Sequence, residues 1–119
     1  MLDRKYEYSY EKMMNEIEKY IHKEDDLNLI KCAYEYALKK HTGQFRKSGE
    51  PYIVHPIAVT TILAGLNCGP NTLCAGLLHD VVEDTETSLD DIKTIFNPDI
   101  AEMVDGVTKV TKLQFSSLK

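Results

Sequence analysis

The sequence lacks any long apolar segment. No run among its 119 residues approaches the roughly 20 apolar residues that a membrane-spanning helix needs. The first twelve residues, MLDRKYEYSYEK, are charged and aromatic, and they contain no apolar stretch of the kind found in a secretory signal peptide. We therefore expect a cytoplasmic protein without a membrane partner.

Cysteine is scarce as well. The three cysteines, Cys32, Cys68 and Cys74, are odd in number and show no Cys-x-x-Cys spacing. This pattern fits neither a disulfide framework nor a cysteine-based zinc site. We expect reduced thiols that are mostly buried.

Positive charge is also in deficit, since the formal net charge is −5. A general nucleic-acid binder needs a basic face that displaces counterions, so we exclude that class. One local exception is a run of basic residues, namely Lys39, Lys40, His41, Arg46 and Lys47. It is either a solvated charged loop, which composition alone favours, or a site for a specific small anion.

The chain shows no internal repeat, no low-complexity tract and no alternating strand pattern. Instead, apolar residues recur every three or four positions in residues 9–22, which predicts an amphipathic helix. Asp25 or Asp26 can cap a second helix that reaches His41. The segment TGQFRKSGEPY then breaks the pattern and predicts an ordered loop, and PYIVHP has the character of a short extended piece.

The second half of the chain continues in helical spacing. Pro56 suits the first position of a third helix, and Asn71 can cap a fourth helix. Ser88, followed three residues later by Asp91, resembles a capping box that begins a short fifth helix. A last apolar stripe follows the Asn97–Pro98 turn. With 43% hydrophobic residues for a core, we predict a compact all-α bundle of about six helices, forming one domain over residues 1–119.

The segment AGLLHDVVEDTET places four polar residues in an apolar helix. His79 and Glu83 are four residues apart, as are Asp80 and Asp84, so each pair shares one side of the helix. Burying unpaired carboxylates costs several kcal/mol, roughly, and a divalent cation is the simplest way to stabilise them. Glu83 and Asp84 could orient a water molecule or move its proton, or they could simply form a solvated helix end.

His55 is the best candidate for a further ligand from another helix. A histidine before a proline at a helix start can also be a plain cap or a packed imidazole, but beside His79 and Asp80 a ligand role is favoured. Mixed imidazole and carboxylate ligands suit Mn²⁺, Fe²⁺ or Zn²⁺ better than Ca²⁺ or Mg²⁺.

Three motifs in this order, HTGQFRKSGEPYIVHP, AGLLHDVVEDTET and IAEMVDGVTKV, carry a resemblance. They resemble the N-terminal hydrolase domain of the RelA/SpoT family, a branch of the HD phosphohydrolase superfamily, over residues 27–116. The resemblance implies an HD-domain helical bundle that uses Mn²⁺ to hydrolyse the 3′-pyrophosphate of ppGpp or pppGpp. The products would be GDP or GTP and pyrophosphate.

The resemblance also implies roles for individual residues. His55, His79 and Asp80 match the family's metal ligands. Glu83 and Asp84 match its catalytic pair, and Arg46 and Lys47 match its substrate-binding residues. The implied partner is a small guanine nucleotide.

The sequence departs from the family pattern near its end. The family's fourth metal ligand is an aspartate in a KLADRLHN-like segment, which has no match here, and Asp105 belongs to the VDGVTK motif instead. The family's synthetase domain has no match either. Two hypotheses follow: a hydrolase module, or a catalytically impaired remnant with a regulatory or interaction role. Stoichiometric Mn²⁺ with turnover would support the first hypothesis and an empty site the second. For this chain we expect weak Mn²⁺ binding and slow or absent hydrolysis of ppGpp, and apolar surface that further helices would cover could drive self-association.

Overall fold

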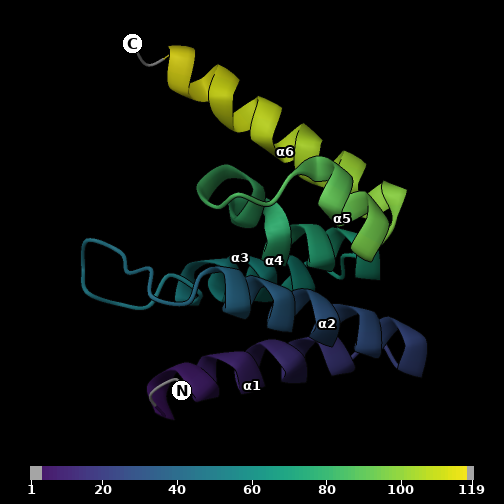
Figure 1. Cartoon of the computed structure of the whole chain (residues 1–119). Coiled ribbons are helices and arrows are strands. Elements are labelled where there is room, and N and C mark those ends of the chain that lie inside the picture. Colours follow the sequence, from purple (N-terminus) through teal and green to yellow (C-terminus); the bar gives the residue numbers. More distant parts are fainter. Residues whose placement is uncertain (1–3, 118–119) are drawn as a thin grey trace.

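A computed structural model describes the backbone of residues 4–117 and the side chains of residues 9–107. It confirms the all-α prediction, and the described part contains no strand beyond one isolated bridge. Figure 1 shows the six helices, which are α1 (Arg4–Glu18), α2 (Glu24–Lys40), α3 (Val54–Gly65), α4 (Pro70–Asp84), α5 (Leu89–Ile95) and α6 (Pro98–Ser117).

Helix α4 lies at the centre of the bundle. It packs against α2, α3 and α6, while α1 packs on α3 and α5 packs on α6. Figure 1 shows α1 and α6 on opposite sides of the central helices. The interior of α4 is fully buried at Leu73, Leu77, Leu78 and Val81, so any polar residue between them is held in an apolar setting.

Four of the predicted helix starts are wrong by a few residues. Helix α1 begins at Arg4 and ends at Glu18, instead of covering the predicted residues 9–22. Lys23, and not Asp25 or Asp26, is the residue before α2. Both aspartates lie in the first turn of α2, where their negative charges interact favourably with the positive end of the helix dipole. Helix α3 begins at Val54, so Pro56 is its third residue, still among the positions whose N–H has no helical partner.

The start of α4 differs for a similar reason. Gly69 precedes the helix and Pro70 takes its first position, where a fixed φ and a missing N–H cost nothing, so Asn71 already lies inside it. The predicted capping box is confirmed: Ser88 Oγ accepts from the Asp91 N–H at 3.1 Å, and the Asp91 carboxylate accepts from the Ser88 N–H at 3.0 Å.

The loop between α2 and α3 projects from the helices (Figure 1) and is ordered, as predicted. Phe45 and Pro51 form an isolated antiparallel bridge, and the Arg46 N–H donates to the Glu50 carbonyl at 2.8 Å. Gly49 closes the turn between them with a φ of +92°, a conformation that costs glycine little. PYIVHP is extended only at Pro51, since α3 begins three residues later.

The thiols are free, but they differ in burial. Cys74 is buried and Cys68 partly buried, whereas Cys32 is exposed, so the prediction of mostly buried thiols fails at Cys32. Burial raises the pKa of the Cys74 thiol to about 12, which keeps it neutral.

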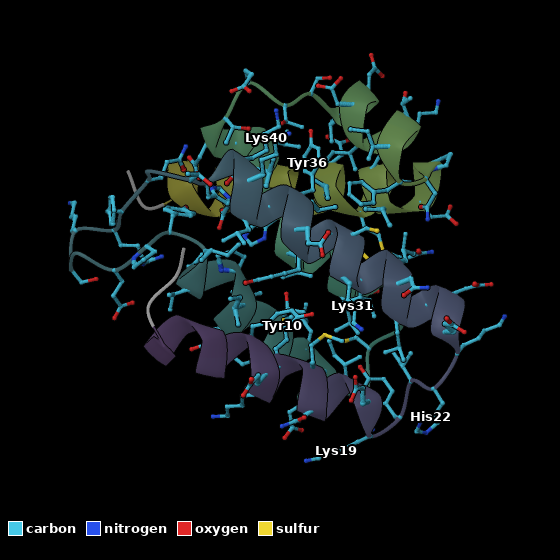
Figure 2. All side chains as sticks on the ribbon, turned by 60° about the horizontal axis from the view of Figure 1, so that its bottom comes forward. Tyr10, Lys19, His22, Lys31, Tyr36 and Lys40 are labelled. Carbon is cyan, nitrogen blue, oxygen red and sulfur yellow. The ribbon has the colours of Figure 1, made fainter. Side chains whose placement is uncertain are left out.

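Figure 2 shows how the charged side chains lie around the bundle, with Lys19 and His22 projecting near the turn between α1 and α2. Lys40, at the other end of α2, contacts the Tyr36 ring at 5.6 Å and pairs with the Glu86 carboxylate at 3.2 Å. Across the described residues, no helix has both the length and the apolar character that crossing a membrane requires.

Candidate metal centre and adjoining loop

The structure brings His55, His79 and Asp80 together. His55 comes from the first turn of α3, and the other two come from the C-terminal half of α4. One ligand atom from each residue can be chosen so that all three lie within 4.8 Å of one another. His55 Nε2 is 3.4 Å from Asp80 Oδ2, and His79 Nε2 is 3.2 Å from Asp80 Oδ1.

Asp80 is the most unusual member of this group. The residue is 5% exposed, and its Oδ2 atom is buried without a hydrogen-bond partner. Removing a carboxylate from water is costly unless hydrogen bonds or a cation compensate. The unsatisfied oxygen therefore fits a site for a cation.

The tautomer of His79 leads to the same conclusion. Its Nδ1 lies 2.8 Å from the Gly76 carbonyl oxygen, which can only accept, so Nδ1 carries the proton. In the neutral ring Nε2 then has a lone pair, and this lone pair faces the Asp80 carboxylate. A second proton or a metal ion relieves the repulsion, and a backbone-anchored Nδ1–H is the usual arrangement of a metal-binding histidine.

His55 is suited to the same role. Burial lowers its pKa; the Asp80 carboxylate opposes that shift, and the Arg46 and His79 side chains add to it. The imidazole is therefore neutral at pH 7 and has a lone pair to offer. These three side chains fit a divalent transition metal by their chemistry, because they combine two imidazoles with one carboxylate.

Glu83 and Asp84 lie at the solvent-exposed end of α4, one turn beyond the buried Asp80. Asp84 is more than a solvated helix end, because its Oδ2 accepts a hydrogen bond from the Tyr52 hydroxyl at 2.8 Å. Its backbone carbonyl also accepts from the Gln44 amide at 3.3 Å. Asp80 is thus buried, whereas Glu83 and Asp84, one turn along the same helix, are exposed to water.

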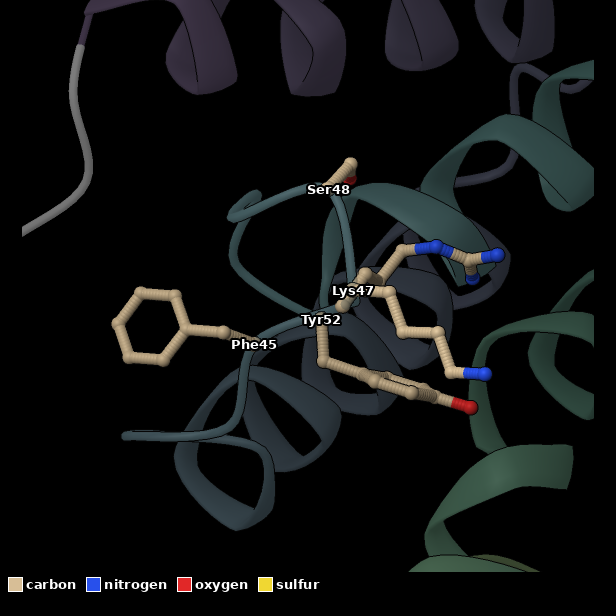
Figure 3. A pocket seen from close by; sticks show the side chains of 5 residues that line it. Phe45, Lys47, Ser48 and Tyr52 are labelled. Atoms are coloured by element: carbon tan, nitrogen blue, oxygen red, sulfur yellow. The ribbon is translucent and has the colours of Figure 1, made fainter.

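Arg46 and Lys47 lie in the projecting loop. Together with Phe45, Ser48 and Tyr52 they line a hollow of about 550 Å³. Figure 3 shows Lys47 and Tyr52 extending to the same side, while Phe45 points the opposite way. The Arg46 guanidinium lies 5.9 Å from the centre of the Tyr52 ring.

The other members of the predicted basic cluster have different surroundings. Lys40 is paired with Glu86, and His41 is buried with its ring stacked on Tyr52 at 4.7 Å. The five basic residues therefore do not form one surface. Arg46 and Lys47 alone among them line the hollow.

Three residues that contribute to this arrangement were not singled out for it from the sequence: His41, Gln44 and Tyr52. The contacts of Tyr52 and Gln44 to Asp84 join residues that are 32 and 40 positions apart in the sequence, and only the folded chain brings them together. No periodicity could have revealed them. Tyr52 does lie within the RKSGEPY motif, which was the only available signal.

Residues 33–118 match the sequence profile of a family described as HD domain. A GTP pyrophosphokinase of Streptomyces coelicolor is 56% identical over 89 residues, which is 75% of this chain and 10% of the relative. A guanosine-3′,5′-bis(diphosphate) 3′-pyrophosphohydrolase of Spiroplasma citri is 49% identical over 102 residues, 86% of this chain and 14% of the relative.

The bifunctional (p)ppGpp synthase/hydrolase SpoT of Escherichia coli K12 is 44% identical over 112 residues, covering 94% of this chain and 16% of the relative. The matches span the loop and both helices that carry the centre. The chain spans less than a fifth of the length of these curated relatives.

Proposed function

Because the chain belongs to the HD domain family, we propose that it hydrolyses the 3′-pyrophosphate of ppGpp and pppGpp, giving GDP or GTP and pyrophosphate. The Spiroplasma citri relative bears the name of this activity, and the Escherichia coli relative is named as a (p)ppGpp synthase/hydrolase. The observation that carries the proposal is the buried Asp80 carboxylate, which faces two imidazoles and has one oxygen without a partner.

His55, His79 and Asp80 would hold the metal, for which we propose Mn²⁺. When bound, a divalent ion supplies positive charge that polarises a phosphoryl oxygen and makes a nearby water more acidic. The protein's contribution is the fixed His79 tautomer and the buried Asp80, which arrange the ligand atoms before the ion arrives.

Arg46 and Lys47 would bind the phosphate oxygens of the nucleotide. A guanidinium can donate two parallel hydrogen bonds to a phosphate, and an ammonium adds a compact charge. Both residues line the hollow beside Tyr52, and Arg46 lies close enough to His55 to lower the pKa of that imidazole. Phosphates bound to this loop would therefore lie next to the centre.

Glu83 and Asp84 would act on the water. In the reaction, the water oxygen forms a bond to the phosphorus on O3′, the P–O3′ bond breaks, and pyrophosphate leaves. The water proton passes to one of the carboxylates, and O3′ takes up a proton to become a hydroxyl. The net reaction consumes a single water molecule.

Pyrophosphate release from ppGpp in the presence of Mn²⁺ tests the proposal, with the variant Glu83→Gln and the matched control Glu102→Gln, an exposed glutamate on α6. We expect release that chelation abolishes, a fall in kcat of roughly 10²–10⁴-fold for Glu83→Gln with nucleotide still bound, and no change for the control. A parent chain with Mn²⁺ bound and no release would overturn the proposal. A Glu83→Gln effect confined to KM would remove Glu83 from catalysis.

A further inference from the structure

Tyr52 contacts each of the three parts of the proposed site. Its hydroxyl donates to Asp84 Oδ2 at 2.8 Å, its ring meets the His55 ring edge-on at 6.2 Å, and the Arg46 guanidinium lies over its face at 5.9 Å. Tyr52 thus joins the proposed phosphate-binding loop, a proposed metal ligand and an exposed carboxylate.

The ring of Tyr52 is held firmly. It stacks on the buried His41 ring with 28° between the two planes, and the backbone N–H of Tyr52 donates to the Gln44 carbonyl at 2.9 Å. The Gln44 side chain is itself fixed, since its Oε1 bonds His41 Nδ1 at 2.9 Å and its amide nitrogen donates to the Asp84 carbonyl. The base of the loop and the last residue of α4 are thus linked twice.

The Tyr52 hydroxyl remains a donor over any practical assay range. Burial raises the pKa of Tyr52, and the hydrogen bond to Asp84 and the nearby Asp80 charge raise it further. A protonated hydroxyl at Oδ2 fixes the direction of the Asp84 carboxylate and leaves its other oxygen for another partner.

On the basis of the proposed function, we propose that Tyr52 is a positioning residue that couples phosphate binding at the Arg46 loop to the placement of the Asp84 carboxylate. A phosphate group bound by Arg46 reduces the mobility of the loop. The Tyr52 ring transmits this restriction to the end of α4. The hydroxyl is needed for the last step, whereas the ring alone suffices for the packing against His41.

Two measurements test this coupling, using Tyr52→Phe, which removes only the hydroxyl. The matched control is Tyr20→Phe, which loses a hydroxyl that donates to the Cys68 carbonyl at 2.6 Å, far from the loop in sequence. The first measurement is amide hydrogen exchange with Mn²⁺, with and without inorganic pyrophosphate. We expect pyrophosphate to slow exchange in residues 42–52 and at the end of α4 in the parent and control, but only in the loop in Tyr52→Phe.

The second measurement is ppGpp turnover. We expect Tyr52→Phe to lower kcat roughly tenfold with KM and Mn²⁺ affinity unchanged. We expect no further loss when Tyr52→Phe is added to Asp84→Ala, because the alanine already removes the carboxylate to which the hydroxyl donates.

The two measurements separate the two proposals. A parent that does not hydrolyse ppGpp would defeat the proposed function, while protection transmitted by pyrophosphate would still support the coupling. Equal protection of α4 in the parent and in Tyr52→Phe, or no protection in the parent, would overturn the coupling even if turnover is observed.

Discussion

At the residue scale, Asp80 determines the chemistry of the site. The carboxylate lies among apolar side chains of α4, and its two oxygens face imidazole nitrogens at 3.2 and 3.4 Å. A protein that needed only to fold would gain stability from an apolar residue here, because the carboxylate loses hydration and finds no hydrogen-bond donor for Oδ2. A bound cation would offset this loss of stability.

A first prediction at this scale concerns Arg46 and Lys47. Replacing either with alanine should weaken ppGpp binding by roughly 1.5–3 kcal/mol, because each would lose a charge-assisted contact to phosphate. Mn²⁺ affinity should change little, since neither side chain is in the ligand cluster. Calorimetric titration of nucleotide and metal measures both quantities.

Lys39→Ala is the control, because Lys39 is an exposed lysine of the same basic run at the end of α2. It should bind ppGpp as the parent does. Should all three variants bind ppGpp equally well, the loop is a solvated surface and not a phosphate site.

At this scale the sequence could predict that His55, His79 and Asp80 lie close together, but not how each side chain is oriented. The proximity of His79 and Asp80 follows from their adjacent positions in an apolar helix. His55 could be predicted to join them because imidazole is a common metal ligand. The orientation of His79 by the Gly76 carbonyl and the Tyr52–Asp84 hydrogen bond depend on how the backbone and loop pack, which no spacing encodes.

At the element scale, the centre depends on how closely α3 and α4 approach. Gly76 allows this approach: a Cβ at this position would lie 2.9 Å from Leu63 Cδ1 and 2.9 Å from Thr60 Oγ1, both on α3. Its carbonyl also holds the His79 ring. The same residue therefore sets the spacing between the helices and the orientation of a proposed ligand.

Gly76→Ala should accordingly destabilise the fold by about 1–3 kcal/mol through overpacking, even though alanine favours helix formation. Gly65→Ala is the matched control, because a Cβ there meets nothing within 4 Å and its effect should be neutral or slightly stabilising. Thermal unfolding followed by circular dichroism measures the difference. Equal melting temperatures for the two variants would show that the interface between α3 and α4 can relax.

The helices themselves could be predicted well from the sequence, whereas their first residues could not. Apolar spacing fixes which face of a helix is buried, but the choice between Gly69 and Asn71, or between Val54 and Pro56, depends on differences in local backbone energy that tertiary contacts easily override. The Ser88 capping box was predictable because two side chains specify it together.

At the scale of the whole molecule, α3 and the residue that follows it present apolar side chains that the described part of the chain leaves exposed. Ile62 and Leu66 are 66% and 70% exposed, and a separate groove of about 620 Å³ between α3, α4 and α6 has Met103 and Val107 on its wall. Exposed apolar surface of this kind favours association. We predict that the chain self-associates through this surface.

Sedimentation velocity over a range of concentrations checks this. The average mass should rise above the 13.6 kDa of the monomer in the parent, and it should stay near that value when Ile62 and Leu66 are both replaced by glutamine. Lys93→Gln, an exposed change on α5, is the control and should associate like the parent. A parent that is monomeric at every concentration would contradict the prediction.

The proposed hydrolysis depends on a metal ion held by His55, His79 and Asp80. A Mn²⁺ titration followed by electron paramagnetic resonance tests this most directly, using the parent, His79→Ala, Asp80→Asn and the control His22→Ala, an exposed histidine outside the cluster. We expect a single Mn²⁺ per chain for the parent and His22→Ala, and affinity at least roughly tenfold weaker for each site variant. Equal binding by all four proteins, or no binding by the parent, would contradict this expectation.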